Sequence, residues 1–336
     1  MAVRATLDSV AARANVSRQT VSNVLNSPHL VRADTAGRVR EAIDQLGYQP
    51  SRAARQLRTR RSMLLGLRLE HDRGGINGAL LDRFLHAVVD AAQQAAYRLV
   101  LFTADDDEAE IHSYADLLAS SELDGFLLTS THHGDPRTSW LSQRKVPFST
   151  FGRPWGAVDQ HHSWVDVDGA AGTRAAVEHL VALGHRRIGF IGWPPGSGVG
   201  DDRRSGWVTA TRAARLPATR TLQAWVEDGV RTGRDAAADL LSRPAPPTAL
   251  VCASDSLALG AHGMDPAVAV TGFDDTPVAR AVGLTSVAQP VVPAAGACLE
   301  QVLEVIDGTA RSSRQVLLHP TLTVRSSTPA PEPSGN

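Results

Sequence analysis

Polar side chains suited to contacts with base pairs gather in the stretch SRQTVSNVLN, residues 17–26. Arginine can donate two hydrogen bonds to a guanine, and glutamine or asparagine can pair with an adenine in the major groove of a duplex. The spacing of the apolar residues places the polar ones on the outer face of a helix. That face carries Arg18, Gln19, Ser22 and Asn23. The stretch is a candidate reading helix for nucleic acid, and the alternative is a helix face that contacts only solvent.

The neighbouring segments predict the elements that would position this helix. Thr6 can cap a short first helix, and Ser17 can cap the second. Asn15 and Val16 predict a tight turn between them. Two short helices joined by a turn, the second with polar side chains at its start, form a helix-turn-helix pattern.

A third helix is expected at about residues 33–46, with Gly47 as its C-terminal cap. Gly37 lies inside it and should cost about 1 kcal/mol relative to alanine. Helical spacing predicts the inward-facing residues of the whole unit. They are Leu7, Val10, Ala11, Ala14, Val21, Val24, Leu25, Val39, Ile43 and Leu46.

Charge is divided unevenly along the 336 residues. Residues 1–62 carry eleven arginines and no lysine against four acidic residues, a net charge of +7. The remaining residues carry 23 basic and 31 acidic residues, a net charge of −8. A basic head on an acidic body indicates that one end binds a polyanion, which favours the nucleic-acid interpretation of the outer helix face.

The stretch YQPSRAARQLRTRRS, residues 48–62, sets one leucine, Leu57, among five arginines. Pro50 has a fixed φ angle, Ser51 can cap a helix, and RAARQL is helix-forming but too short to be stable alone. The stretch is therefore either a flexible basic tether or a short helix that needs a partner.

From Met63 onward, short apolar runs alternate with amphipathic stretches, which is typical of parallel sheets flanked by helices. Nine such strands are more than one compact βα unit uses, so the predicted fold class is α/β with two doubly wound lobes. A ligand cleft is expected at the carboxyl ends of the strands. The expected strands are 64–69, 98–104, 124–130, 146–152, 163–168, 187–193, 248–254, 267–273 and 285–290, and the helices between them include 80–96, 172–184 and 233–242.

No catalytic residue, cofactor or metal is expected. The glycine-rich run 192–200 lacks both GK[ST] and GxGxxG, and the chain has no GxSxG elbow. The histidine pairs 132/133 and 161/162 lack the i, i+4 spacing of common metal ligands. These patterns argue against an enzyme.

Cys252 and Cys298 are too few for a disulfide framework and indicate core residues in a reducing cytosol. No window approaches the ~20 apolar residues of a membrane helix. Arg4 and Asp8 interrupt the apolar region that a signal peptide needs. A cytoplasmic protein without membrane contact is expected.

Two long ordered motifs, TLDSVAARANVSRQTVSNVLN and VREAIDQLGYQPSRAARQL, resemble the N-terminal region of the LacI family (LacI/GalR type) of bacterial transcriptional repressors. The likeness continues along almost the whole chain, whose body is similar to the family's periplasmic-binding-protein-like effector domain. It implies a headpiece at 1–50, a hinge helix at 51–62 and a core at 63–327. The first lobe would hold about 63–162 plus 293–325, and the second about 163–290. The Pro-rich residues 328–336 are expected to be disordered.

The resemblance also implies site residues. The hinge helix would order on operator DNA, with Leu57 wedged into the minor groove and neighbouring arginines on phosphates. The implied DNA contacts are Thr6, Ser17, Arg18, Gln19, Thr20, Ser22, Asn23, Asn26, Tyr48, Ser51, Arg52, Ala54, Arg55, Leu57 and Arg58. The implied effector contacts are Arg203, Asp274, Ser254, Asp255, Trp193 and Trp164. Each of these could instead be structural, Asp255 as a helix cap above all.

An arginine, carboxylates and aromatic side chains in a cleft suit a polyhydroxylated ligand. Together with this ligand type, the resemblance implies a homodimeric repressor of a carbohydrate-utilisation operon that binds a near-palindromic operator and responds to a sugar, with a purine or nucleoside effector as the alternative. A solute-binding protein and a sugar-modifying enzyme are the rivals from other classes. One departure from the family pattern, a shortened segment after Ala261, concerns the dimer contact and the ligand response.

Overall fold

The computed structural model describes residues 5–48, 61–70, 78–121, 123–156 and 161–331. The chain divides into two compact units, residues 1–62 and 63–336. The hinge residues Ser51 to Arg58 therefore lie outside the described residues. So do the last five residues of the chain.

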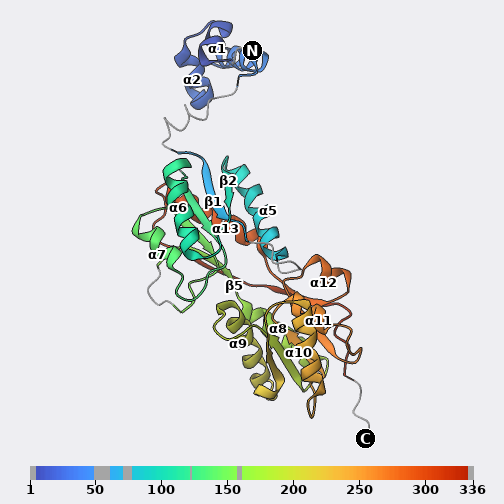
Figure 1. Cartoon of the computed structure of the whole chain (residues 1–336). Coiled ribbons are helices and arrows are strands. Elements are labelled where there is room, and N and C mark those ends of the chain that lie inside the picture. The colour runs from blue at the N-terminus through green and yellow to red at the C-terminus, as the bar shows by residue number, and fades with distance from the viewer. Residues whose placement is uncertain (1–4, 49–60, 71–77, 122, 157–160, 332–336) are drawn as a thin grey trace. The chain divides into compact units, whose positions relative to one another are not determined.

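The first unit is helical: α1 is Leu7–Ala14, α2 is Arg18–Asn26, and α3 is Ala33–Leu46 (Figure 1). The Thr6 hydroxyl accepts a hydrogen bond from the Ser9 backbone N–H, and the Ser17 hydroxyl accepts one from Thr20, so both predicted caps are formed. A short 3-10 helix, Pro28–Leu30, joins α2 to α3.

Val10, Val21 and Val39 are fully buried and form the centre of the headpiece core. Tyr48 also packs into this core and is 9% exposed. Leu46 is 37% exposed, so its predicted place in the buried stripe of α3 was wrong. It is the last residue of α3, where Gly47 turns the chain into the left-handed region and the helix face ends.

The first lobe of the second unit is built on a six-stranded sheet in the order β11-β5-β4-β3-β1-β2, with every pairing parallel. Two layers of helices cover it, since α5 and α13 pack on one face and α6 and α7 on the other (Figure 1). The strands are β1 Leu64–Arg68, β2 Arg98–Phe102, β3 Gly125–Leu128, β4 Phe148–Phe151, β5 Trp164–Val167 and β11 Gln315–Leu318. The helices are α5 Ala79–Gln94, α6 Asp107–Ser121, α7 Pro136–Gln143 and α13 Val291–Ile306.

Successive side chains of β3 point to opposite faces of the sheet and pack under different helices. Leu127 joins the core under α5 and α13, whereas Phe126 and Leu128 join the core under α6 and α7. All three are buried, as in a strand whose two faces are both covered.

The second lobe has a six-stranded sheet in the order β12-β10-β9-β8-β6-β7, in which only β12 is antiparallel. Helices cover both of its faces around a core centred on the fully buried Trp207. The strands are β6 Ile188–Gly192, β7 Gln223–Trp225, β8 Ala249–Cys252, β9 Ala269–Phe273, β10 Thr285–Ala288 and β12 Thr321–Thr323. The helices are α8 Gly169–Ala182, α9 Gly198–Ala213, α10 Val230–Ser242, α11 Asp255–Ala261 and α12 Pro277–Ala281, with a 3-10 turn at Arg220–Leu222.

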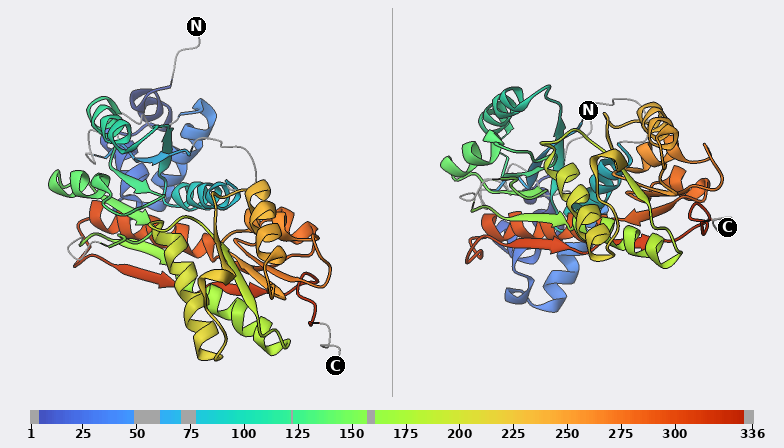
Figure 2. Two further views of the ribbon diagram at one scale, coloured as in Figure 1. Left: turned by 60° about the horizontal axis from the view of Figure 1, so that its bottom comes forward. Right: turned by 90° about the horizontal axis from the view of Figure 1, so that it is seen from below.

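The nine predicted strands correspond to nine of these twelve, and the pattern missed β7, β11 and β12, which are short and half-exposed. The lobe boundaries also differ from the expected ones. β5 pairs with β4, so the first crossing between lobes follows Val167 rather than preceding residue 163. The last crossing lies between β11 and β12, and Figure 2 shows the red C-terminal segment passing from one lobe to the other.

Residues 328–331, predicted as part of a disordered tail, pack on the second lobe. The hydroxyl of Thr328 bonds to His179, and the carbonyl of Pro329 bonds to His185. The prediction of disorder was wrong for these four residues, because it used only their proline-rich composition and not the histidines of the second lobe that bind them. No helix among the described residues is long and apolar enough to cross a membrane.

Candidate functional site

A cavity of about 700 Å³ lies where the carboxyl ends of strands from both sheets meet. The first lobe lines it with residues that follow β1, β3 and β4, and the second with residues from α9 and the ends of β6 and β9. This is the place at which doubly wound sheets bind ligands. The cavity therefore coincides with the predicted cleft.

Arg203 and Asp274, two of the residues that the resemblance implied, lie together at this cavity. Arg203 extends from α9 and is 5% exposed, and its Nη2 lies 3.4 Å from Oδ1 of Asp274. Its Nη1 donates to the carbonyl of Ala253, and the guanidinium carbon lies 3.7 Å from the ring centre of Phe273. The arginine is held on three sides, so its head has a defined position before any ligand binds.

Asp274 follows β9 with a φ of 109°, a conformation that non-glycine residues rarely adopt. Burial raises the pKa of its carboxyl to about 7, against the opposing charge of Arg203. Gln289 donates a 2.6 Å hydrogen bond to the same oxygen that faces Arg203. A strained, buried carboxyl with a perturbed pKa is typical of a functional position.

Of the other four predicted effector contacts, only Trp193 is among the described residues that line the cavity. Trp193 lines the cavity, and its ring centre lies 5.3 Å from the Arg203 guanidinium carbon. Ser254 caps α11 and Asp255 accepts bonds from Thr276 and Ser286; neither is among the described residues that line the cavity. Trp164 begins β5 and is also outside the lining.

The physical reason for these departures is that strand-end position alone does not give the direction of a side chain. Ser254 and Asp255 are used to start α11 and to hold the loop after β9. Ser254 does donate to Asp228, which lines the cavity. Its place is thus behind the wall of the cavity.

Several cavity residues were not found from the sequence, namely Arg68, Glu70, Trp155, Asp202, Asp228 and Gln289. Arg68 and Glu70 lie at the end of β1 and just after it and pair with each other, a position that a search of every strand end would have included. Burial works against ionisation of Glu70, but hydrogen bonds from Ser130 and Arg68 leave its pKa below the usual value.

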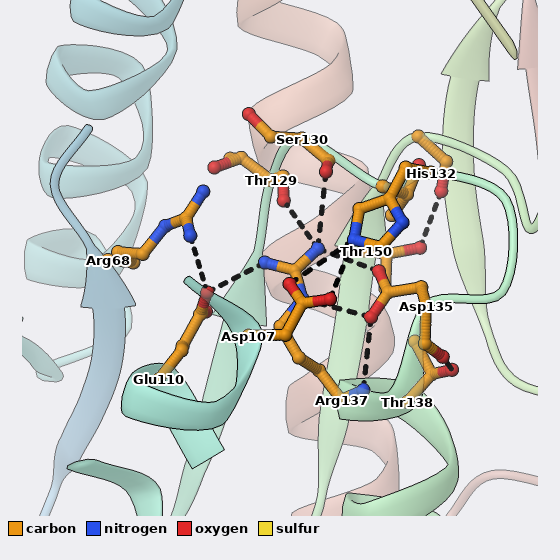
Figure 3. A network of polar contacts seen from close by, with 12 residues as sticks. Arg68, Asp107, Glu110, Thr129, Ser130, His132, Asp135, Arg137, Thr138 and Thr150 are labelled. Carbon is orange, nitrogen blue, oxygen red and sulfur yellow. Dashed lines mark hydrogen bonds and ion pairs between the residues drawn. The ribbon is translucent and has the colours of Figure 1, made fainter. Parts of the chain in front are cut away.

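A network of ion pairs, shown in Figure 3, links the cavity residue Arg68 to the buried Glu110 and Arg137. Nη1 of Arg68 and Nη1 of Arg137 each lie 2.8 Å from Oε2 of Glu110. Arg137 also pairs with Asp135 at 2.7 Å and donates to the carbonyls of the loop after β3. Because that loop lines the cavity, the network positions cavity residues rather than contacting a ligand itself.

His132 belongs to the edge of the same network. Its Nε2 lies 3.0 Å from Asp107, and potential ligand atoms of Asp107, His132 and Asp135 lie within 4.8 Å of one another. The Arg137 guanidinium already pairs with both carboxylates. The trio is therefore a set of paired charges, which leaves little reason to place a cation there.

A clasp joins the lobes beside the cavity. Arg153, from the loop after β4, bonds to Asp166 at 2.5 Å and reaches Asp202 of α9 at 3.3 Å. Trp155 lies against Gly198 at the start of α9, and the Arg153 guanidinium carbon lies 4.7 Å from the Trp155 ring centre. Burial raises the pKa of Asp202, which Arg153 opposes.

The headpiece presents part of the predicted reading face. Arg18 is exposed on α2, and Gln19 donates a 2.9 Å hydrogen bond to Asn23. Ser22 also lies on α2. Thr6 and Ser17 cap α1 and α2, and the hydroxyl of Thr20 is hydrogen-bonded to that of Ser17. Tyr48 packs in the headpiece core. The side chain of Asn26 is outside the described residues.

Comparison with known proteins assigns the fold to a family. The model of "Bacterial regulatory proteins, lacI family" matches residues 6–51, and that of the periplasmic binding protein-like domain matches residues 177–328. The HTH-type transcriptional regulator CelR of Thermobifida fusca is 32% identical over 338 residues, covering 96% of this chain and 98% of CelR. The chain belongs to the LacI family.

Other LacI-family proteins are also similar to this chain in sequence or structure. The PurR repressor of Klebsiella pneumoniae strain 342 is 28% identical, with 96% of each chain covered. The lac repressor dimer bound to operator and the anti-inducer ONPF has a TM-score of 0.78 at 26% identity, covering 98% of this chain and all of that one. A complex of CelR with cellobiose has a TM-score of 0.71 at 31% identity, covering 96% and 100%.

Membership of the LacI family confirms the predicted fold of a helical headpiece followed by two parallel α/β sheets. The protein is a DNA-binding transcriptional regulator and not an enzyme, and its family places it in the cytoplasm. Membership of the family does not determine the effector, because CelR, at 32% identity, and PurR, at 28%, are both relatives of this chain.

Proposed function

We propose that the protein is a homodimeric repressor of a carbohydrate-utilisation operon, released from or held on a near-palindromic operator by a sugar in the cavity. The observation that carries the proposal is the Arg203–Asp274 pair beside Phe273, buried in a cavity between the lobes. A guanidinium and a carboxylate fixed next to an aromatic face can bond to sugar hydroxyls while the ring contacts the apolar face of the sugar. The complex of the related CelR protein with cellobiose supports a sugar.

DNA binding is proposed to use the exposed residues of α2 together with the hinge. Arg18, Gln19 and Asn23 would contact base edges, while the caps Thr6 and Ser17 would fix the helices against the phosphates. Two-fold symmetry of the dimer would require two half-sites. The lac repressor dimer bound to operator, similar along nearly the whole chain, supports this arrangement.

A purine effector is the second candidate, because PurR repressors are among the relatives. The shape of the fold does not separate the two, since both would occupy the same cleft. The choice between them depends instead on the charges and the volume of the cavity.

The test begins with selection of bound sequences from random duplexes by the full-length protein, followed by retardation assays on the selected site. A sugar that changes the affinity for this site, while the Asp274→Ala variant binds the site and ignores the sugar, is the expected result. If the full-length protein selects no preferred duplex sequence, the proposed operator binding is contradicted. A response to purines alone would contradict the sugar effector. The size of a ligand-induced change is commonly about 1–3 kcal/mol of coupling.

A further inference from the structure

Four N–H donors on cavity-lining side chains are buried without a partner among the described residues. They are Nε of Arg68, Nε of Arg203, Nε1 of Trp155 and Nε1 of Trp193. Buried polar groups nearly always find a hydrogen-bond partner, and a cluster of unpaired ones needs an explanation. Two of the donors come from each lobe, so a bound molecule that offers acceptor atoms to both lobes would satisfy the set.

The cavity also presents acceptors. Asp202 and Asp228 line it from the second lobe together with Asp274, and Glu70 lines it from the first. Carboxylates accept hydrogen bonds and cannot donate them when ionised. The bound molecule must therefore supply hydroxyl or other donors as well as acceptors, a combination that each hydroxyl group of a sugar provides.

The balance of charge among the described lining residues disfavours an anionic ligand. Six acidic residues line the described part of the cavity against two arginines, and each arginine is already paired with a carboxylate, Arg68 with Glu70 and Arg203 with Asp274. Among the described lining residues, a phosphate or carboxylate on the ligand would meet carboxylates and two arginines that already have carboxylate partners. Of the helix N-termini that reach the cavity, those of α8 and α9 are already capped by the side chains of Asp168 and Ser197, whereas that of α5 has no side-chain cap.

Size favours more than one ring. A volume of about 700 Å³ lies just above the middle of the range of about 300–1,000 Å³ that is usual for ligand pockets, so it has room for more than one sugar ring. Aromatic rings line the cavity from both lobes: Phe84 stacks on Phe151 in the first, and Trp193 and Phe273 each lie near the Arg203 guanidinium in the second. A single sugar ring or a purine base would leave part of this surface without contact.

We propose that the effector is a neutral oligosaccharide of at least two sugar rings, whose oxygen atoms accept hydrogen bonds from the indole N–H groups of Trp155 and Trp193 and from the Nε atoms of Arg68 and Arg203. This inference rests on the proposed function and narrows its ligand class. It assigns the two tryptophans, one from each lobe, as hydrogen-bond donors that only a ligand long enough to reach both lobes can satisfy together.

The experiment is calorimetric titration of the full-length protein with a matched panel. Cellobiose, maltose and lactose represent neutral disaccharides; cellobionate carries the same two rings with a carboxylate; glucose, glucose 6-phosphate and hypoxanthine test size, phosphate and purine. At least one neutral disaccharide should bind roughly 100-fold more tightly than each charged or smaller compound. Tightest binding of cellobionate, glucose 6-phosphate, glucose or hypoxanthine, or no binding by any of the three disaccharides, would overturn the inference.

Two conservative variants test the assigned donors. Trp155→Phe and Trp193→Phe keep an aromatic ring but remove the N–H, and each should weaken disaccharide binding roughly 3- to 10-fold, the usual effect of one hydrogen bond. The matched control is Trp225→Phe, a half-buried tryptophan of β7 outside the cavity lining, which should change affinity less than twofold. Unchanged affinity in both cavity variants would contradict their role.

Failure of this inference differs from failure of the proposed function. If the protein binds a selected duplex and a purine or a charged sugar dissociates it, the regulator stands and the neutral-oligosaccharide inference falls. If the protein binds a neutral disaccharide but no duplex sequence, the inference stands and the proposed operator function falls.

Discussion

The indole of Trp155 in the first lobe lies directly over Gly198 in the second, so that a Cβ atom at position 198 would stand 2.2 Å from the ring. No real Cβ approaches an aromatic carbon this closely, and one of the two groups would have to move. Gly198 is the first residue of α9, the helix that carries both Asp202 and Arg203. The contact thus ties the position of the lobes to the helix that presents the central arginine.

Gly198→Ala should hinder the approach of the lobes and weaken effector binding at least tenfold, with little change in the unfolding midpoint. The reason is steric, because the added methyl displaces Trp155 from the clasp. Calorimetric titration with the strongest ligand of the disaccharide panel measures the effect. Gly296→Ala is the matched control, since a Cβ there meets nothing within 4 Å and helix propensity alone should favour alanine. Equal affinities of the two variants would contradict the clasp.

Effector affinity should rise with pH through about 7, the raised pKa of buried Asp274. Below this pH the protonated carboxyl accepts fewer bonds from ligand hydroxyls, whereas above it the carboxylate accepts them fully. For folding the sign is opposite: the raised pKa means that the native state holds this proton between about pH 4 and 7, so stability from Asp274 declines as pH rises across that window.

Titrations at pH 6 and pH 8 measure this dependence. Asp274→Asn should bind more weakly at pH 8 and show a smaller difference between the two pH values. Burial also raises the pKa of Asp202, so titration of Asp202 would account for any pH dependence that Asp274→Asn retains. The same slope in wild type and Asp274→Asn would assign the titration to another group.

Arg137→Met should destabilise the protein by about 3–5 kcal/mol, because the substitution leaves Glu110 and Asp135 buried without their shared cation. Arg137 is 1% exposed, so water cannot compensate. Urea unfolding measures the loss, and Arg212→Met, at an exposed arginine in the last turn of α9, should change stability by less than 0.5 kcal/mol, roughly the limit for surface substitutions. A loss below 1 kcal/mol, within roughly the range of exposed ion pairs, would show that the network carries little of the stability.

Arg18→Ala should lower affinity for the selected duplex by about 1–3 kcal/mol and relax the preference at one base position of each half-site. Arg38→Ala removes an exposed arginine of α3 and serves as the control for net charge. Retardation assays with specific and random duplexes at two salt concentrations separate the two effects. If both variants lose affinity equally on both duplexes, Arg18 contacts phosphate and does not read a base.

Leu57→Ala should weaken binding to the selected duplex and reduce its bend, while salt-dependent binding to random duplex stays nearly unchanged. The apolar wedge would be lost without any change in charge. Arg58→Ala is the contrasting variant, since loss of a phosphate contact should weaken both kinds of binding and lower the salt slope by about one. Operator affinity equal to wild type in Leu57→Ala would favour the flexible-tether interpretation of residues 48–62.

The elements of this fold could be predicted from local patterns. Helical spacing and capping residues predicted α1, α2 and α3 within a residue at each end, because caps satisfy backbone groups within a few positions of themselves. Apolar runs predicted nine strands, since strands buried on both faces leave a continuous signal. Short strands such as β11, with alternating half-exposed residues, gave no comparable signal.

The candidate site was predictable only in part. Arg203, Asp274 and Trp193 do line the cavity, whereas Trp164, Ser254 and Asp255, which the same resemblance implied, do not. The position of a residue at a strand end is a local property. Whether its side chain enters the cavity depends on which helix or loop competes for it, as α11 does for Ser254.

The sequence by itself determined the fold class and the headpiece, because each depends on spacing within one segment, whereas Arg203 and Asp274 were implied by the resemblance to the LacI family. Only the tertiary structure decided that Arg68, Trp155 and Asp202 share a cavity with them, since these residues lie in three segments brought together by chain crossings between lobes. It also decided which donors remain unpaired when the chain is folded. Pairing of buried groups is a property of the whole packed structure, and no single segment contains it.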